Sequence, residues 1–370
     1  MKKVKLGEYV KIRTGKLDAN ASSENGKYPF FTCSVTPLKI DTYSYDCECV
    51  LVAGNGDLNV KYYNGKFDAY QRTYIIESKD KEILTVPYLY SFLDKYVETL
   101  REQSIGGVIK YIKLGNLTDA IIPLPSVEEQ EKIVEKLDKV SGLIEKRKTQ
   151  LEKLNLLIKS RFIEMFGDPV KNSMSWKTSL LKNVTSKIGS GATPKGGKES
   201  YQDEGITLIR SMNVHDGRFE YKDLAHITDE QANQLDNVTI EENDVFVNIT
   251  GASVARSCIV PKHILPARVN QHVAIIRCIS SILNPVFVNN LFLNNTFKGQ
   301  LLDIGESGGA TRQAITKQQL ETLVIILPPL KLQSEFATFV EQVDKSKFEI
   351  QKSLEKLEIL KKSLMQQYFG

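Results

Sequence analysis

The chain has 370 residues, of which 41% are hydrophobic, and its formal net charge of +4 at pH 7 favours an anionic partner without requiring one. It is longer than one ordinary domain and apolar enough for two units that each bury a core. No window is long and apolar enough to cross a bilayer, and Met1–Val10 holds no apolar signal core, so we expect a cytosolic protein.

Strand signals open the first unit. An apolar run at 50–53 predicts a buried strand, and the glycines that follow it predict a tight turn. After this turn we expect a hairpin with strands at 60–63 and 66–76, because Asn64 followed by Gly65 suits the turn that joins two strands.

Helical signals close the first unit. We predict a helix over 88–100, a loop at Gly106–Gly107, and a strand over 117–122 that runs into Pro123. About forty residues without proline follow, which predicts one long helix over 127–167.

The end of the chain repeats this segment. Residues 112–167 align with residues 315–370 without a gap, and the alignment places Gln130 on Gln333. The second copy therefore predicts another long helix over 330–370. An internal repeat of this length indicates a duplicated fold.

Signals of the first unit recur in the second half. The strand at 245–247 matches 50–52, residues 270–276 match 70–76, a helix at 286–298 matches 88–100, Gly308–Gly309 match Gly106–Gly107, and Gly251 falls in the turn after the strand. We therefore predict an α+β fold with two similar globular units. The predicted domains are a first unit (1–126), a central helix (127–167), a second unit (168–329) and a C-terminal helix (330–370), with a linker at 167–175 rich in turn-forming residues.

The two long helices are expected to pair as an antiparallel coiled coil. Apolar residues recur at heptad spacing along both, which is typical of helices that pack against each other. With Leu151 opposite Ile350, the cation Lys361 faces Val140 and no cation of one seam meets a cation of the other. The predicted helix-pair interface consists of Leu137, Ile144, Leu151, Leu154, Ile158, Val343, Ile350, Leu354, Leu357 and Leu364.

This pairing predicts a function as well as a shape. Because each unit precedes its helix, antiparallel helices place the units at opposite ends of a rod, related by an approximate two-fold axis. Such an arrangement suits the reading of two separated patches on B-DNA, whose equivalent groove faces recur about every 34 Å. A stand-alone coiled-coil adaptor, or dimerisation stalk, is the alternative.

No set of residues predicts catalysis. Residues 284–287 read Asn-Pro-Val-Phe, close to the Asn-Pro-Pro-Phe loop of adenine methyltransferases, but the second proline is missing and no glycine-rich cofactor motif lies upstream. Gly191–Lys198 departs from the phosphate-loop pattern in having Glu199 where Ser or Thr belongs. The histidines and cysteines lack metal-binding and disulfide spacings. We expect no catalytic residue, no metal and no cofactor in this chain; an autonomous methyltransferase is a further alternative.

Basic and amide side chains in turns are the candidates for DNA contact. Arg and Lys bind guanine or phosphate, and Asn and Gln bind adenine edges. Loops on a rigid scaffold usually carry recognition. The candidate DNA-binding residues are Lys61, Tyr62, Lys66, Gln71, Arg72, Lys110, Thr193, Lys195, Lys198, Arg210, Asn213, Arg218, Arg256, Arg312 and Gln313. For each one, a solvated surface charge is the competing interpretation, and Asn270 and Gln271 either contact DNA or tie off backbone groups within the fold.

Several of these features together resemble a known family. The strand-Leu-Pro-helix junction at Ile122–Gln130 has a twin at Ile326–Gln333, a Gly-Ser-Gly-Ala-Thr-Pro run stands at Gly189–Pro194, and Asn248–Gly251 is followed by Asn270–Gln271. The whole chain resembles the specificity subunit of type I restriction-modification systems. The first unit lacks the Gly-Thr-Pro turn of the second.

The resemblance implies a fold with two target-recognition domains separated by two long helices. It implies binding to duplex DNA at a bipartite asymmetric sequence, each domain reading one half. It also implies association with two modification subunits, which transfer a methyl group from S-adenosylmethionine to adenine, and with restriction subunits that cleave and translocate DNA.

Overall fold

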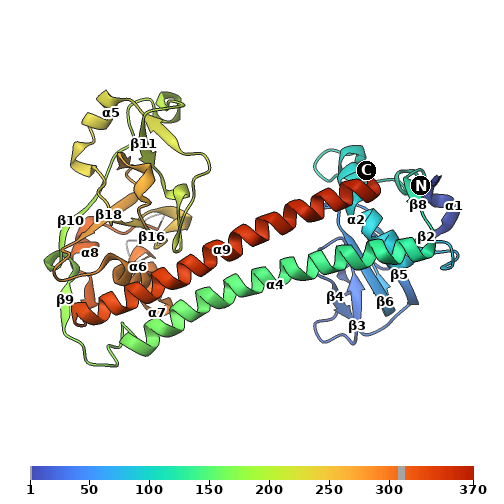
Figure 1. Cartoon of the computed structure of the whole chain (residues 1–370), viewed down its shortest axis with the longest axis horizontal. Helices are drawn as coiled ribbons and strands as arrows, with labels where there is room; N and C mark the ends of the chain where they lie inside the picture. The colour runs from blue at the N-terminus through green and yellow to red at the C-terminus, as the bar shows by residue number, and fades with distance from the viewer. Residues whose placement is uncertain (1, 307–312) are drawn as a thin grey trace. The chain divides into compact units, whose positions relative to one another are not determined.

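The computed structural model describes residues 2–306 and 313–370, and the chain divides into two compact units. Unit 1 comprises Met1–Thr149 and Ile350–Gly370, and unit 2 comprises Gln150–Glu349. The long helices α4 (Val127–Phe166) and α9 (Leu330–Phe369) each contribute one half to each unit (Figure 1). Each long helix is therefore part of both cores.

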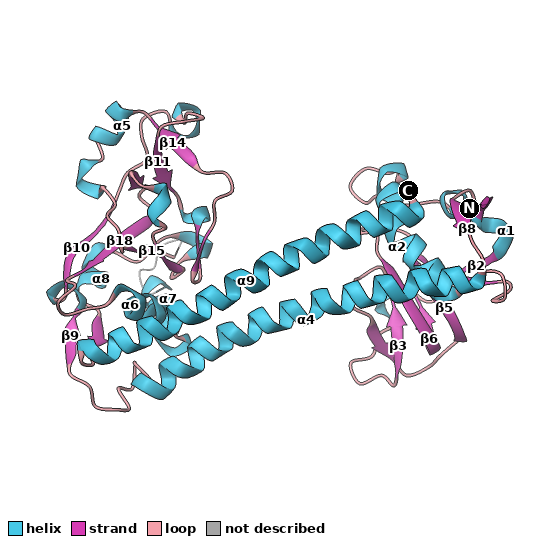
Figure 2. Cartoon of the chain, in the orientation of Figure 1, coloured by secondary structure: helices cyan, strands magenta, loops and turns pink. Residues whose placement is uncertain are grey.

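Unit 1 is built on a six-stranded sheet in the order β2-β7-β5-β6-β3-β4. Its elements are β1 (Lys2–Lys5), α1 (Leu6–Tyr9), β2 (Val10–Thr14), β3 (Tyr28–Phe31), β4 (Leu38–Ile40), β5 (Tyr45–Ala53), β6 (Val60–Ala69), β7 (Thr73–Ser78), α2 (Val86–Gln103), α3 (Leu114–Thr118) and β8 (Ile121–Leu124). Side chains alternate along β5, so Val50 and Val52 pack in the core that contains α2, while Cys49 and Leu51 pack in a second cluster. The apolar run read from the sequence lies in strand β5 (Figure 2), and its residues are buried on both faces of the sheet.

The predicted hairpin at Asn64–Gly65 is wrong. Both residues lie within the continuous strand β6, opposite Glu48 and Cys47 of β5. The long β5 ladder continues through this dipeptide, so tertiary pairing overrides its local preference for a turn. The turn comes later, at residues 70–72, before β7.

The strand predicted over 117–122 begins later than expected. Leu117 belongs to the short helix α3, and the strand is β8, which pairs antiparallel with β1 through Lys3 and Pro123. Pro123 stands at an edge of this two-stranded sheet, where a missing backbone donor is tolerated.

Unit 2 repeats the centre of unit 1. Its elements are β9 (Thr178–Leu180), β10 (Thr185–Ser190), β11 (Ile206–Ile209), β12 (Val214–His215), β13 (Arg218–Phe219), β14 (Ala225–Ile227), α5 (Asp229–Asn233), β15 (Val245–Asn248), β16 (Ser257–Ile259), β17 (Ala267–Val269), β18 (Val273–Cys278), α6 (Pro285–Leu293), α7 (Asn295–Glu306), α8 (Lys317–Glu321) and β19 (Val324–Ile326). The order β10-β18-β15-β16 corresponds to β2-β7-β5-β6. Even the register is kept, since Val245 pairs with Ile276 as Val50 pairs with Ile76.

The units differ around this common centre. Unit 1 extends its sheet with β3 and β4, whereas unit 2 adds a separate sheet in the order β14-β11-β17. The single helix α2 of unit 1 corresponds to two helices in unit 2, because Asn294 ends α6 and its side chain accepts a hydrogen bond from Thr296 N–H, 3.1 Å away, at the start of α7. The expected α+β fold with an internal repeat is confirmed.

The long helices run antiparallel within each unit. In unit 1, Ile133 and Leu137 near the start of α4 share a core with Met365 and Tyr368 near the end of α9. In unit 2, the ring centroid of Phe336, near the start of α9, lies 5.4 Å from that of Phe166, at the end of α4. All ten residues of the predicted helix-pair interface are buried or half-buried.

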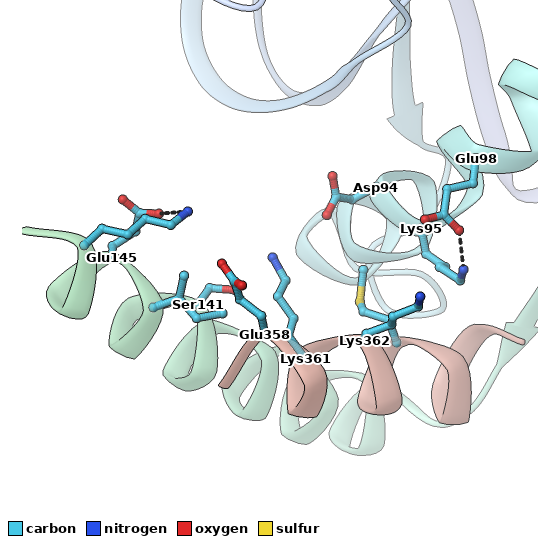
Figure 3. Close-up of a pocket in the computed structure, with 11 residues that line it drawn as sticks. Asp94, Lys95, Glu98, Ser141, Glu145, Glu358, Lys361 and Lys362 are labelled. Atoms are coloured by element: carbon cyan, nitrogen blue, oxygen red, sulfur yellow. Dashed lines mark hydrogen bonds and ion pairs between the residues drawn. The ribbon is translucent and has the colours of Figure 1, made fainter. Parts of the chain in front are cut away.

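A cation in the helix seam of unit 1 lines a pocket that a carboxylate of α2 also lines. Lys361 of α9 and Asp94 of α2 line a pocket of about 440 Å³ between α2, α4 and α9. Figure 3 shows Lys361 and Glu358 projecting from α9 into the space that Asp94 also borders. Burial raises the pKa of Asp94, and the charge of Lys361 opposes that rise. The sequence placed Lys361 against Val140 and did not foresee this partner.

Candidate nucleic-acid interface

Both units place a glycine directly after the first strand of the shared sheet. Gly15 follows β2 and donates its N–H to the carbonyl of Thr73, the first residue of β7, at 3.0 Å. Gly191 follows β10 and donates its N–H to the carbonyl of Asn270, in the turn before β18, at 3.1 Å. A Cβ on Gly15 would lie 2.1 Å from the carbonyl oxygen of Ala69, and one on Gly191 would lie 1.8 Å from that of Val269. We call the end of β2 or β10 at this glycine, together with the turn at 70–72 or 270–272, the glycine-held edge. The two units share this edge, although Gly15 lacks the sequence motif that surrounds Gly191.

The turn before β7 or β18 lies against this glycine and carries the corresponding residues Gln71 and Gln271. Both side chains are exposed. Gln71 donates from Nε2 to Asp18 at 2.7 Å, whereas Gln271 accepts a hydrogen bond from the Thr193 hydroxyl. Arg72 is also exposed on this turn. The same backbone position thus presents different polar groups in the two units.

Asn270 and Gln271, which the sequence left undecided, take different roles. Asn270 is buried, and its Oδ1 accepts the His272 N–H at 3.0 Å, so it holds the turn. Beside it, Thr250 Oγ1 and His272 Nδ1 lie 2.6 Å apart. Gln271 is the member of the pair that is available to a ligand.

The three β6 candidates of unit 1 do not lie together. Lys61 is half-buried and bonded to Asn59, whose Nδ2 donates to the Cys33 carbonyl at 2.8 Å. Burial lowers the pKa of Lys61. The strand alternation directs Tyr62 to the other face, where its hydroxyl donates to Glu48 at 2.8 Å.

Lys66 lies further along the same strand as these two residues. It is exposed, with its Nζ 4.7 Å from the ring centroid of Tyr43. Of the three, only Lys61 is linked to the edge that carries Arg72, since the Cys33 thiol lies 3.6 Å from the Arg72 carbonyl oxygen.

In both units a second segment, which contains Lys110 or Gln313, is hydrogen-bonded to the turn after β5 or β15. The Lys110 carbonyl accepts the Gly56 N–H at 2.9 Å, and the Gln313 carbonyl accepts the Gly251 N–H at 2.9 Å. Lys110 is exposed, and Gln313 donates from Nε2 to Glu306 at 2.7 Å. The neighbouring candidate Arg312 lies outside the described residues. These contacts bring Lys110 and Gln313 to corresponding places.

Asn213 is fully buried, which contradicts its predicted role at a DNA surface. Its Nδ2 donates to the Glu220 carbonyl at 3.0 Å, and its Oδ1 accepts the Arg210 N–H at 3.1 Å. The amide closes a turn by pairing these backbone groups. Burial, which decides this role, cannot be read from a single polar residue in a sequence.

The other candidates of unit 2 are spread over several loops. Arg210 is half-buried, with its guanidinium 5.4 Å from the ring centroid of Tyr201, and Arg218 is exposed and 3.4 Å from Glu220. Arg256 is half-buried. The exposed candidates Lys195 and Lys198 flank two glycines with positive φ. A short 3-10 turn, Gly197–Ser200, follows in place of the α-helix of a phosphate loop.

The methyltransferase-like residues 284–287 form the start of a helix. Asn284 Oδ1 accepts the Val286 N–H at 2.9 Å and caps α6, while Phe287 is fully buried in the core. These contacts give the segment a structural role. Within the described part of the chain, no group of three or more His, Cys, Asp and Glu residues is placed to hold a metal ion, and no helix is long and apolar enough to cross a membrane.

Comparison with known sequences identifies a family match along most of the chain. Residues 1–155 and 174–361 match the family described as "Type I restriction modification DNA specificity domain". One matched segment lies in each half of the chain.

Individual relatives agree with this match. The chain is 43% identical over 158 residues to the type I restriction enzyme EcoDI specificity subunit of Escherichia coli, covering 43% of this chain and 35% of that protein. It is 23% identical to the EcoBI specificity subunit of Escherichia coli over 69% of this chain and 58% of the relative. The chain thus spans less than two thirds of the length of these two relatives. With the MjaVIII specificity subunit of Methanocaldococcus jannaschii, identity is 21%, covering 98% of this chain and 90% of the relative.

Solved structures show the same fold. The S subunit of a type I restriction-modification system from M. genitalium superposes with a TM-score of 0.64 at 15% identity, covering 100% of this chain and 96% of that one. A chain from a study of complex assembly in the type I system gives a TM-score of 0.57 at 18% identity, covering 100% of this chain and 97% of that one.

Proposed function

Because the chain belongs to the family of type I restriction-modification DNA specificity domains, we propose that it recognises a bipartite asymmetric sequence in duplex DNA, with each unit reading one half. It acts as the specificity subunit of a complex whose other subunits methylate adenine and cleave DNA. The observation that carries this proposal is the glycine-held edge: Gly15 and Gly191 occupy the same place in two sheets of equal register, yet different polar side chains surround them.

The chemistry of that edge suits the major groove of DNA. Exposed amide and guanidinium groups, as at Gln71, Arg72 and Gln271, match adenine and guanine edges. Exposed lysines such as Lys110 and Lys195 suit phosphate contacts, which position a protein on the duplex. Two units that recognise different half-sites need the same backbone framework with different side chains on it.

We assign two matching pairs of exposed apolar residues on the long helices to two copies of one partner, the modification subunit. Leu156 and Leu157 of α4 are 62% and 46% exposed, and Ile359 and Leu360 of α9 are 70% and 45% exposed. These pairs occupy the same places in the gapless repeat alignment. Apolar residues that stay exposed at matching places indicate an interaction surface present once in each repeat.

In this proposal the chain itself is not an enzyme. The modification subunits bind S-adenosylmethionine and transfer its methyl group, and the restriction subunits supply cleavage and movement along DNA. The contribution of this chain is to bind the site and to orient its partners on it. A coiled-coil adaptor would need no pair of similar sheets with divergent edges, so that alternative is not favoured.

The test is a map of methylated adenines made by the purified complex of this chain and a modification subunit. The proposal predicts methylation at one sequence made of two defined halves separated by an undefined spacer of fixed length. Methylation scattered over unrelated sequences, or unchanged in pattern when this chain is omitted, would count against it.

A further inference from the structure

Unit 1 carries a short loop with an apolar tip, here called the finger loop, Ile105–Tyr111. Ile105 and Tyr111 exchange both backbone hydrogen bonds, at 3.0 and 2.8 Å, and so close the loop. Gly106 has φ +117°, and a Cβ there would lie 2.6 Å from the Ile109 carbonyl oxygen. Only glycine suits this place. The tip consists of Val108, which is fully exposed, and Ile109, which is 62% exposed.

Backbone hydrogen bonds attach the finger loop to the glycine-held edge of unit 1. Gly56 N–H donates to the Lys110 carbonyl at 2.9 Å, and Ile112 N–H donates to the Gly54 carbonyl at 2.9 Å. Gly54 in turn donates its N–H to the Arg72 carbonyl at 2.8 Å. The apolar tip is therefore anchored to the same turn that presents Gln71 and Arg72.

The apolar tip needs a chemical explanation, because Val108 and Ile109 gain nothing from exposure to water. The adjacent Lys110 and the nearby Lys113 are exposed and favour an anionic partner over an apolar protein surface. The major groove of DNA presents one apolar group among its donors and acceptors, the 5-methyl group of thymine.

We propose that Val108 and Ile109 contact the 5-methyl group of a thymine in the half-site that unit 1 reads. This inference rests on the proposed function and adds to it a base preference for one half. In unit 2 the pair that matches Gly106–Gly107 is followed by Ala310, Thr311 and Arg312, which lie outside the described residues and include no pair of branched apolar residues like Val108–Ile109. The sequence of unit 2 thus offers no equivalent apolar pair, and we assign the thymine-methyl contact to unit 1.

The experiment uses the complex with modification subunits and a set of duplexes carrying its mapped site. Each thymine is replaced in turn by deoxyuridine, which pairs identically but lacks the methyl group. In one half-site, one such replacement should weaken binding about fourfold, the effect of losing one buried methyl group. The complex with Val108→Ser and Ile109→Ser should bind the thymine duplex as weakly as the uracil duplex and no longer distinguish them.

Two further variants complete the design. Val108→Thr exchanges one methyl for a hydroxyl at nearly constant shape and should lose part of the discrimination. Ile83→Ser, at an apolar residue of unit 1 that is 44% exposed and outside the finger loop, should keep all of it. Equal thermal unfolding midpoints of the variants show that the fold is intact.

The inference is overturned if no thymine of either half-site responds to removal of its methyl group, or if the doubly substituted complex still discriminates. It is also overturned if the double substitution weakens assembly with the modification subunit in the absence of DNA, because the loop then binds protein. Failure of the proposed function looks different: the unaltered complex would have no preferred site from which to build the duplexes.

Discussion

Gln130 and Gln333, one in each unit, make the same three hydrogen bonds to corresponding backbone groups. Gln130 accepts the Thr85 N–H at 2.9 Å and donates to the carbonyls of Ile83 and Pro125 at 2.8 and 3.0 Å. Gln333 accepts the Asn284 N–H at 2.9 Å and donates to the carbonyls of Ile282 and Pro328 at 3.2 and 2.8 Å.

Both glutamines are fully buried. Each one joins the start of a long helix to the residue that precedes α2 or α6 and to the proline segment before its own helix. The duplication therefore extends to the atoms that fix each long helix to its unit.

Loss of either glutamine should destabilise its own unit. Gln130→Ala leaves three backbone groups without a partner, which should cost about 2–4 kcal/mol. Hydrogen exchange should show faster opening around α2 for Gln130→Ala and around α6 for Gln333→Ala. A variant that accelerates exchange equally in both units, or in neither, contradicts this local role.

A matched glycine pair tests the glycine-held edge. Gly191→Ala forces a Cβ to within 1.8 Å of the Val269 carbonyl oxygen, whereas a Cβ on Gly189 meets nothing within 4 Å. Gly191→Ala should lower stability by about 1–3 kcal/mol, as overpacking does, and should weaken DNA binding. Gly189→Ala is the control and should leave both close to the parent. Urea unfolding and binding titrations measure the effect, and equal behaviour of the two variants would refute the close approach.

Asp94 should make unit 1 less stable at neutral pH than an uncharged residue would. Burial raises its pKa, so the folded state holds the proton more tightly and stability falls as pH rises from the ordinary aspartate pKa through the raised one. Asp94→Asn should therefore unfold at a higher temperature than the parent at pH 7, and the difference should vanish as the pH falls below the ordinary range. A lower melting temperature for Asp94→Asn at pH 7 would show that its attraction to Lys361 outweighs its burial.

Lys110 is predicted to contact a phosphate. Lys110→Ala should weaken binding to all duplexes alike and reduce the slope of log affinity against log salt by about 1. Lys146→Ala, which removes an exposed charge from α4, is the control and should leave the slope unchanged. An unaltered slope for Lys110→Ala would remove this residue from the interface.

The sequence predicts most where a pattern is long. Heptad spacing and the absence of proline predicted helices over 127–167 and 330–370, and the structure has them at Val127–Phe166 and Leu330–Phe369. The register of strand pairing is harder to predict from the sequence because it depends on strands that are distant in the chain. Asn64–Gly65 has the local preference of a turn, but pairing with β5 keeps it in a strand.

The candidate interface was only partly predictable for the same reason. Gln71, Arg72 and Lys110 were selected by residue type, and the structure brings them to one edge. Gly15 was not selected as part of the interface because no sequence motif surrounds it. A glycine is needed there because the Ala69 carbonyl oxygen leaves no room for a Cβ. Val108 and Ile109 were not selected as candidate DNA-binding residues. The sequence does not show whether an apolar loop residue is buried in the core or exposed to a ligand, and the structure shows that these two are exposed.

The most direct test of the account is to replace residues 168–329 with the corresponding segment of another member of the family and to map methylated adenines with the resulting complex. If each unit reads one half-site, one half of the recognition sequence changes and the other half stays as it was. A change in both halves, or in neither, would contradict the assignment of one half-site to each unit.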